Sequence, residues 1–129
     1  MIELLNEIGR CNICAAHLEH GVNPVMSASP QSRIAIIGQA PGSVVHKTGI
    51  PWDDKSGQRL RTWLGVDDQQ FYNVNAFALI PMGFCYPGKG KSGDLPPRKE
   101  CAPAWHHRLF ASMPKLELKI LIGSYAINY

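Results

Sequence analysis

The sequence has no run of about eighteen consecutive apolar residues, which is the length a helix needs to cross a bilayer. It also shows no internal repeat and no low-complexity tract. The opening segment, MIELLNEIGR, is amphipathic and carries acidic side chains, unlike a secretory signal. The net charge of +3 is small, so it permits a nucleic-acid partner without requiring one. We therefore expect a cytoplasmic protein with no membrane-spanning segment.

Nucleotide-binding fingerprints are missing as well. Neither G-x-G-x-x-G nor a Walker motif is present, so nucleotide binding through a glycine-rich turn has little support. The chain has only four cysteines and no secretory signal, which argues against a disulfide framework and favours metal or cluster ligation. The remaining composition, 45% apolar and 18% charged over 129 residues, is typical of a single soluble globular domain.

The most informative stretch is residues 38–57, GQAPGSVVHKTGIPWDDKSG. It follows an apolar run with β character at 33–37 and precedes a helical pattern at about 56–64, which Ser56 could cap. Leu60, Trp63 and Leu64 form the expected inward stripe of that helix. A loop between a strand and a helix lies at the carboxyl edge of a sheet, where open α/β folds bind their ligands.

The rest of the chain continues this alternation. Residues 2–8 predict an amphipathic helix, 71–80 and 119–123 predict strands, and 81–98 predict a long irregular loop. Another helix is expected from Glu100 through Met113, with His106 and His107 as ordinary surface or cap residues. The sequence thus predicts an α/β fold.

Two asparagines interrupt the apolar run at 71–80. Asn73 and Asn75 each need a hydrogen-bond partner if they are buried. One interpretation is that they cap turns or bond to neighbouring backbone. The other is that one of them reaches a ligand, because a carboxamide offers a donor and an acceptor to a pyrimidine edge.

The cysteines form one close pair, Cys11-x2-Cys14, and a second pair, Cys85 and Cys101, at the long loop. Four thiolates suit an iron–sulfur cluster and equally suit a structural zinc ion, and free thiols are a third possibility. His17 and His20 continue the three-residue spacing of the first pair, either as ligands or as polar helix-end residues.

Residues 38–57 resemble the first motif of the uracil-DNA glycosylase superfamily, and the closest resemblance is to its thermostable, iron–sulfur branch. That motif reads G-E-A-P-G-x8-P-F-x4-G. The matching positions are Gly38, Ala40, Pro41, Gly42, Gly49, Pro51 and Gly57, with Gln39 in place of Glu and Trp52 in place of Phe. The resemblance implies a single domain over residues 1–129, a three-layer α/β/α fold with a mainly parallel sheet, and a [4Fe–4S] cluster on the four cysteines.

The resemblance also implies a function: flipping uracil, or a related deaminated base, out of DNA and hydrolysing its N-glycosidic bond. Trp52 would stack on the base, and Asn75 would form hydrogen bonds with its edge. The backbone N–H groups around Gln39 and Ala40, beside Gly38, would donate hydrogen bonds to its oxygen. Gln39 and Asn75 are the expected catalytic residues. Because an amide cannot take a proton from water, the neighbouring acids Asp53 and Asp54 are possible substitutes.

One segment of the family pattern has no counterpart. A His-Pro-Ser loop follows the third strand in the family, and this sequence ends at Tyr129 without it. We therefore expect a sheet that is incomplete on its C-terminal side. The alternative function is a metal-stapled nucleic-acid-binding module that keeps the fold without the chemistry. In either case we expect a monomer that acts on DNA.

Overall fold

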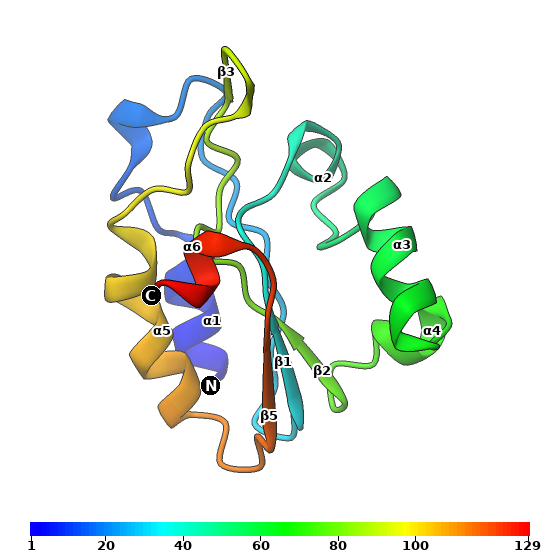
Figure 1. Ribbon diagram of the computed structural model, residues 1–129. Helices are drawn as coiled ribbons and strands as arrows, with labels where there is room; N and C mark the ends of the chain where they lie inside the picture. The colour runs from blue at the N-terminus through cyan, green and yellow to red at the C-terminus, as the bar shows by residue number, and fades with distance from the viewer.

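Three parallel strands form the centre of the structure, a computed structural model that describes residues 1–129 (Figure 1). The middle strand is β1 (Ile34–Ile37), and β2 (Phe77–Leu79) and β5 (Leu118–Leu121) flank it. Ala35 lies in register with Ala78 on one side and Lys119 on the other. Because the strands are parallel, their carboxyl ends lie at the same edge of the sheet.

Helices cover both faces of this sheet, which confirms the predicted three-layer α/β/α arrangement (Figure 1). One layer contains α1 (Ile2–Gly9), α5 (Cys101–Ala111) and α6 (Ser124–Ile127). The other contains α2 (Ser43–Thr48), α3 (Lys55–Leu64) and α4 (Asp68–Phe71). A short 3-10 helix (Ala15–His17) and a hairpin of β3 (Lys89–Gly90) and β4 (Gly93–Asp94) complete the elements. No helix is long and apolar enough to span a membrane.

The two faces of the sheet contribute to two separate hydrophobic cores, because successive strand side chains point to opposite sides. Ala35 and Ile37 of β1 pack with α1 and α5, whereas Ile36 packs with α3 and α4. Strand β2 alternates in the same way, with Ala78 in the first core and Leu79 in the second. A strand buried on both faces reads as a continuous apolar run, and this explains the sequence pattern at 33–37.

The strand expected at 71–80 is much shorter than predicted. Asp67 and Gln70 form a capping box that starts α4, and this helix takes up Phe71. The Asn73 side chain then accepts a hydrogen bond from the backbone N–H of Asn75 (3.1 Å), which makes a turn of the segment before β2. Local side-chain bonds therefore replace strand pairing over the first half of the run.

Three smaller expectations were also wrong. Helix α3 is capped by Asp54, whose Oδ1 accepts from the backbone N–H of Gly57 at 2.8 Å, and not by Ser56. Trp63 does not belong to the inward stripe, because 75% of it is exposed. His106 is not a surface residue: it is 3% exposed, and its Nε2 lies 2.8 Å from the carbonyl oxygen of Pro81, to which it donates. By contrast, Gly65 ends α3 with a left-handed φ of 70°, as expected.

Candidate active site

A cleft of about 610 Å³ lies at the carboxyl edge of the sheet. Each strand contributes the residues that follow its end: Gly38 and Gln39 after β1, Pro81 after β2, and Gly123 after β5. The volume is within the range of small-molecule sites, which is about 300–1,000 Å³. The structure thus confirms that the loop beginning at Gly38 opens onto a cavity where a doubly wound sheet would bind a ligand.

Trp52 forms part of the cleft wall and explains two glycines of the 38–57 stretch. A Cβ on Gly38 would lie 2.7 Å from the Trp52 ring, and a Cβ on Gly57 would lie 1.6 Å from the Trp52 carbonyl oxygen. Neither position can carry a side chain while Trp52 stays where it is. Trp52 itself has a φ of 59°, a backbone conformation that is uncommon for a residue with a side chain. The loop is therefore built closely around this one aromatic residue.

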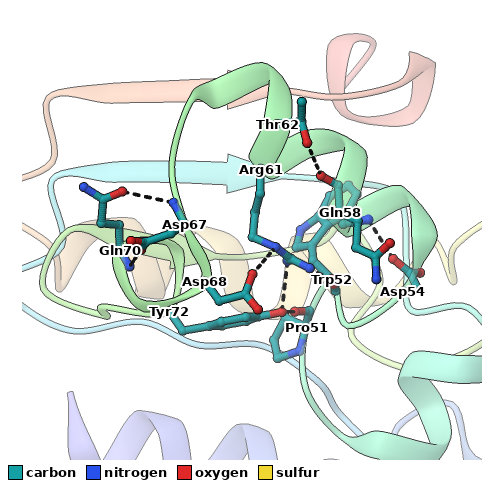
Figure 2. A network of polar contacts seen from close by, with 11 residues as sticks. Pro51, Trp52, Asp54, Gln58, Arg61, Thr62, Asp67, Asp68, Gln70 and Tyr72 are labelled. Atoms are coloured by element: carbon teal, nitrogen blue, oxygen red, sulfur yellow. Dashed lines mark hydrogen bonds and ion pairs between the residues drawn. The ribbon is translucent and has the colours of Figure 1, made fainter.

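A buried arginine holds the backbone of Trp52 in place (Figure 2). Arg61 of α3 donates from Nη1 to the Trp52 carbonyl oxygen at 3.1 Å and to the Tyr72 hydroxyl oxygen at 3.2 Å. The Tyr72 hydroxyl donates in turn to the Pro51 carbonyl oxygen at 2.7 Å. Since Arg61 and Tyr72 come from different segments, residues 51–52 are fixed by tertiary contacts and not by local turn preference.

The guanidinium of Arg61 has one acidic partner and lies over two aromatic rings. Its Nε lies 2.8 Å from Oδ1 of Asp68, and its guanidinium lies over the rings of Phe71 and Tyr72, at 5.1 and 5.4 Å from their centroids. The Arg61 side chain is only 8% exposed, so losing a partner would leave a buried charge with unmet hydrogen bonds. Burial also raises the pKa of Tyr72, which keeps its hydroxyl protonated as a donor to Pro51.

The first residues after β1 present free hydrogen-bond donors. The carbonyl oxygens of Gly38 and Gln39 accept from the backbone N–H groups of Met82 and Gly83, at 2.8 and 3.0 Å. This pairing extends the strand geometry past the end of the sheet and fixes the orientation of the turn. The backbone N–H groups of Gln39 and Ala40 have no acceptor within the protein, and both residues line the cleft. Two backbone donors without a partner in the protein thus belong to residues of the cleft lining, where a ligand could use them.

Charged side chains reach the cleft from two other segments. Asp54 and Arg59 come from α3 and its cap, and Asp94 comes from the β3–β4 hairpin. Asp53, one of the two acids suggested by the sequence, does not line the cleft. Arg59 and Asp94 were not identified from the sequence. The only available signal was the length and basic character of the 81–98 loop, which did not single out Asp94.

Asn75 does not reach this cleft, contrary to expectation. It precedes β2, so it lies at the amino edge of the sheet, whereas Gln39 lies at the carboxyl edge. Its Oδ1 accepts a hydrogen bond from the Ser29 hydroxyl at 3.2 Å, and it lines a separate surface depression with Gln31 and Arg33. The role of Asn75 was expected from aligning Tyr72 and Pro81 with the family pattern, and that alignment does not place its side chain at the cleft.

The structure brings all four predicted cysteines to one cavity. Cys11 and Cys14 follow α1, Cys85 comes from the long loop, and Cys101 begins α5. The backbone N–H of Phe84 donates to Cys101 Sγ at 3.3 Å. No group of three or more His, Cys, Asp or Glu side chains is arranged closely enough to hold a single metal ion. His17 and His20 do not line the cavity.

Three residues that line the same cysteine cavity carry buried polar atoms without a hydrogen-bond partner. Arg98, Glu100 and Trp105 all line it, and each has one buried side-chain atom without a hydrogen-bond partner: Nε, Oε1 and Nε1 respectively. Two of these, Arg98 Nε–H and Trp105 Nε1–H, are donors. Buried polar groups are almost always bonded, so unpaired donors beside four sulfur atoms suit an acceptor held between them.

Burial raises the pKa of Cys14 and Cys85, and raises that of Cys101 to about 12. The neighbouring thiols act in the same direction, because each thiolate would repel the others. At neutral pH these thiols therefore favour their protonated form, and binding of a cationic group would release their protons.

The comparison with known families identifies the fold. A model of the uracil-DNA glycosylase superfamily matches residues 26–129, which include the whole three-stranded sheet and every residue of the cleft lining except Val25. The chain belongs to this superfamily. Membership agrees with the resemblance seen at residues 38–57, and it gives the protein a glycosylase-like function that acts on DNA. The match begins after Cys11 and Cys14, so it does not include the first cysteine pair.

Proposed function

We propose that the protein is a DNA glycosylase that flips uracil, or a related deaminated base, into the cleft and hydrolyses its N-glycosidic bond. The observation that carries this proposal is the arrangement of Trp52 beside the free N–H groups of Gln39 and Ala40 at the carboxyl edge of the sheet. An aromatic surface and two fixed donors are what a flipped pyrimidine needs for stacking and for its carbonyl oxygen.

The donors would contribute most at the moment of bond cleavage. As the bond breaks, negative charge develops on the departing base, and N–H groups already aimed at its oxygen stabilise that charge without reorganising. Trp52 would bind the base in the ground state, where a base–aromatic stack contributes roughly 1–3 kcal/mol. The Gln39 carboxamide lines the same cleft and can position a water molecule or read the base edge.

The four cysteines would hold the [4Fe–4S] cluster that the resemblance implies. Their all-thiol donor set suits such a cluster, and so do the unpaired N–H donors of Arg98 and Trp105, because sulfur atoms accept hydrogen bonds. When bound, the cluster would connect the segment after α1 to the long loop and α5.

The glycosylase activity is tested with oligonucleotides that carry a single uracil or thymine, in single- and double-stranded form. Alkaline cleavage at abasic sites reports excision. We expect excision of uracil and not of thymine, and loss of activity in Trp52→Ala with partial recovery in Trp52→Phe, which keeps an aromatic face. Tight binding of uracil-containing DNA without any excision would contradict the proposal and favour a binding module.

The cluster is tested by iron, sulfide and zinc analysis, together with a visible spectrum, on protein purified without oxygen. We expect iron and sulfide in equal amounts, about four of each per chain. The variant Cys101→Ser should lose both, whereas a substitution at the exposed His17 should lose neither. Stoichiometric zinc in place of iron would contradict the cluster.

A further inference from the structure

Hydrolysis requires a proton acceptor, and the residues assigned so far, Trp52, Gln39 and Ala40, do not supply one. A water molecule that attacks the sugar must give up a proton, and the amide of Gln39 cannot take one. The sugar also gains positive charge as the base departs, which a nearby anion would stabilise. Two carboxylates line the cleft, those of Asp54 and Asp94.

Asp54 already has a structural task. Its Oδ1 accepts from the backbone N–H of Gly57 at 2.8 Å and caps helix α3. Asp94 has no comparable partner. It forms no ion pair, not even with Lys89, which lies opposite it in the β3–β4 hairpin. Helix α2, which begins directly after Gly42, has no side-chain cap, so Asp94 does not act as one.

The Asp94 carboxylate lies next to the turn that presents the free N–H groups. Its Oδ2 is 3.6 Å from the point that a Cβ on Gly42 would occupy, and Gly42 follows Gln39 by three residues. A Cβ at residue 42 would meet this carboxylate at an ordinary van der Waals distance, so the hairpin lies close to the turn. The hairpin therefore places the Asp94 carboxylate, which has no ion-pair or hydrogen-bond partner in the protein, in the same cleft as Gln39 and Ala40.

We propose that Asp94 is the catalytic carboxylate of this site; this inference rests on the glycosylase function proposed above. The bond between C1′ and the base nitrogen breaks, and its electron pair leaves with the base, which then takes a proton from solvent. The water oxygen forms the new bond to C1′. The proton of that water passes to the Asp94 carboxylate and from there to solvent, so the reaction is a simple hydrolysis. Before proton transfer, the ionised carboxylate stabilises the positive charge on the sugar.

A merely structural Asp94 would behave differently. As an exposed hairpin residue opposite Lys89, it would contribute a small cross-strand attraction and nothing specific to a charged ligand. The two roles are separated by two oligonucleotides with analogues at the target position. One carries a neutral tetrahydrofuran abasic site, and the other carries a pyrrolidine whose ring nitrogen is protonated and mimics the cationic sugar.

The experiment measures binding of both oligonucleotides, and uracil excision, for the wild-type protein, Asp94→Asn and Asp53→Asn. Asp53 is the matched control, because it is an exposed acid in the connection between α2 and α3 and does not line the cleft. We expect Asp94→Asn to lower the preference for the cationic analogue by about tenfold or more, with unchanged affinity for the neutral one. The excision rate should fall by roughly 10²–10⁴-fold. Asp53→Asn should match the wild type in all three measurements.

Other outcomes overturn the inference in distinguishable ways. If wild-type protein excises uracil and Asp94→Asn matches Asp53→Asn, the assignment of Asp94 is wrong and the glycosylase function stands. If wild-type protein neither excises uracil nor prefers the cationic analogue, both the proposed function and the role of Asp94 are wrong. Equal thermal unfolding temperatures for the three proteins would show that folding does not explain the difference.

Discussion

Gly57 is the glycine at which an added side chain should lower the free energy of unfolding most. A Cβ there would lie 1.6 Å from the Trp52 carbonyl oxygen, so Gly57→Ala must move this backbone by more than an ångström to reach even the closest tolerated contact, 3.0 Å. That movement would break the bond from Arg61 Nη1 to the same oxygen, which is now 3.1 Å long. Two costs therefore combine in one substitution.

The magnitude follows from these contacts. Overpacking a buried site costs about 1–3 kcal/mol, and losing a hydrogen bond from a buried charged donor costs about 1.5–3 kcal/mol. Alanine in a helix regains about 0.5–1 kcal/mol relative to glycine. Since the first two costs overlap, we expect Gly57→Ala to lower the free energy of unfolding by about 2–4 kcal/mol. Domains of this kind have about 5–15 kcal/mol in total, so the variant should still fold.

Gly9 provides the matched control. It is also a helical glycine, the last residue of α1, and a Cβ there would meet nothing within 4 Å. We expect Gly9→Ala to be neutral or to stabilise the protein by up to about 1 kcal/mol. Urea unfolding followed by fluorescence gives both free energies, provided that the slopes agree. A Gly57→Ala variant that is as stable as Gly9→Ala would refute the idea that the glycines of this motif exist to accommodate Trp52.

Three further predictions concern single side chains. Burial lowers the pKa of His106, so the unfolded chain takes up a proton more readily; stability should be complete above about pH 6.5 and fall as the pH drops below it. His106→Gln should remove part of this pH dependence and the exposed His107→Gln none of it, as urea unfolding at several pH values would reveal. Asn75→Ala should keep full discrimination between uracil and thymine in the excision assay, because Asn75 lies at the amino edge of the sheet; a loss of discrimination would contradict the site described above. If the cysteines hold the proposed cluster, Trp105→Phe, which removes an unpaired donor at their cavity, should still bind iron but with a shifted reduction potential in voltammetry; an unchanged potential would argue against a bond from Trp105 to that cluster.

The sequence determined the parts of this protein that depend on local pattern. Apolar runs predicted β1 and β5, the glycine at residue 65 predicted the end of α3, and the loop after β1 predicted a cleft at the carboxyl edge. These predictions succeeded because strand burial, helix capping and βα connection are properties of short segments. The spacing of residues 38–57 also identified the superfamily, since glycines and prolines at fixed distances encode one loop conformation.

Only the tertiary structure decided which side chains share a site. Asn75 was misplaced because its role came from aligning Tyr72 and Pro81 with the family pattern, whereas side-chain bonds from Asp67 and Asn73 make a helix and a turn that leave Asn75 before β2. Asp94 was missed because it reaches the cleft through a hairpin whose direction no local pattern specifies. The convergence of the four cysteines, from segments up to 90 residues apart, was expected from the family resemblance and not from local pattern, because it depends on how α1, the long loop and α5 pack. Contacts between distant segments are set by the whole packed core, and a local reading of the sequence does not contain them.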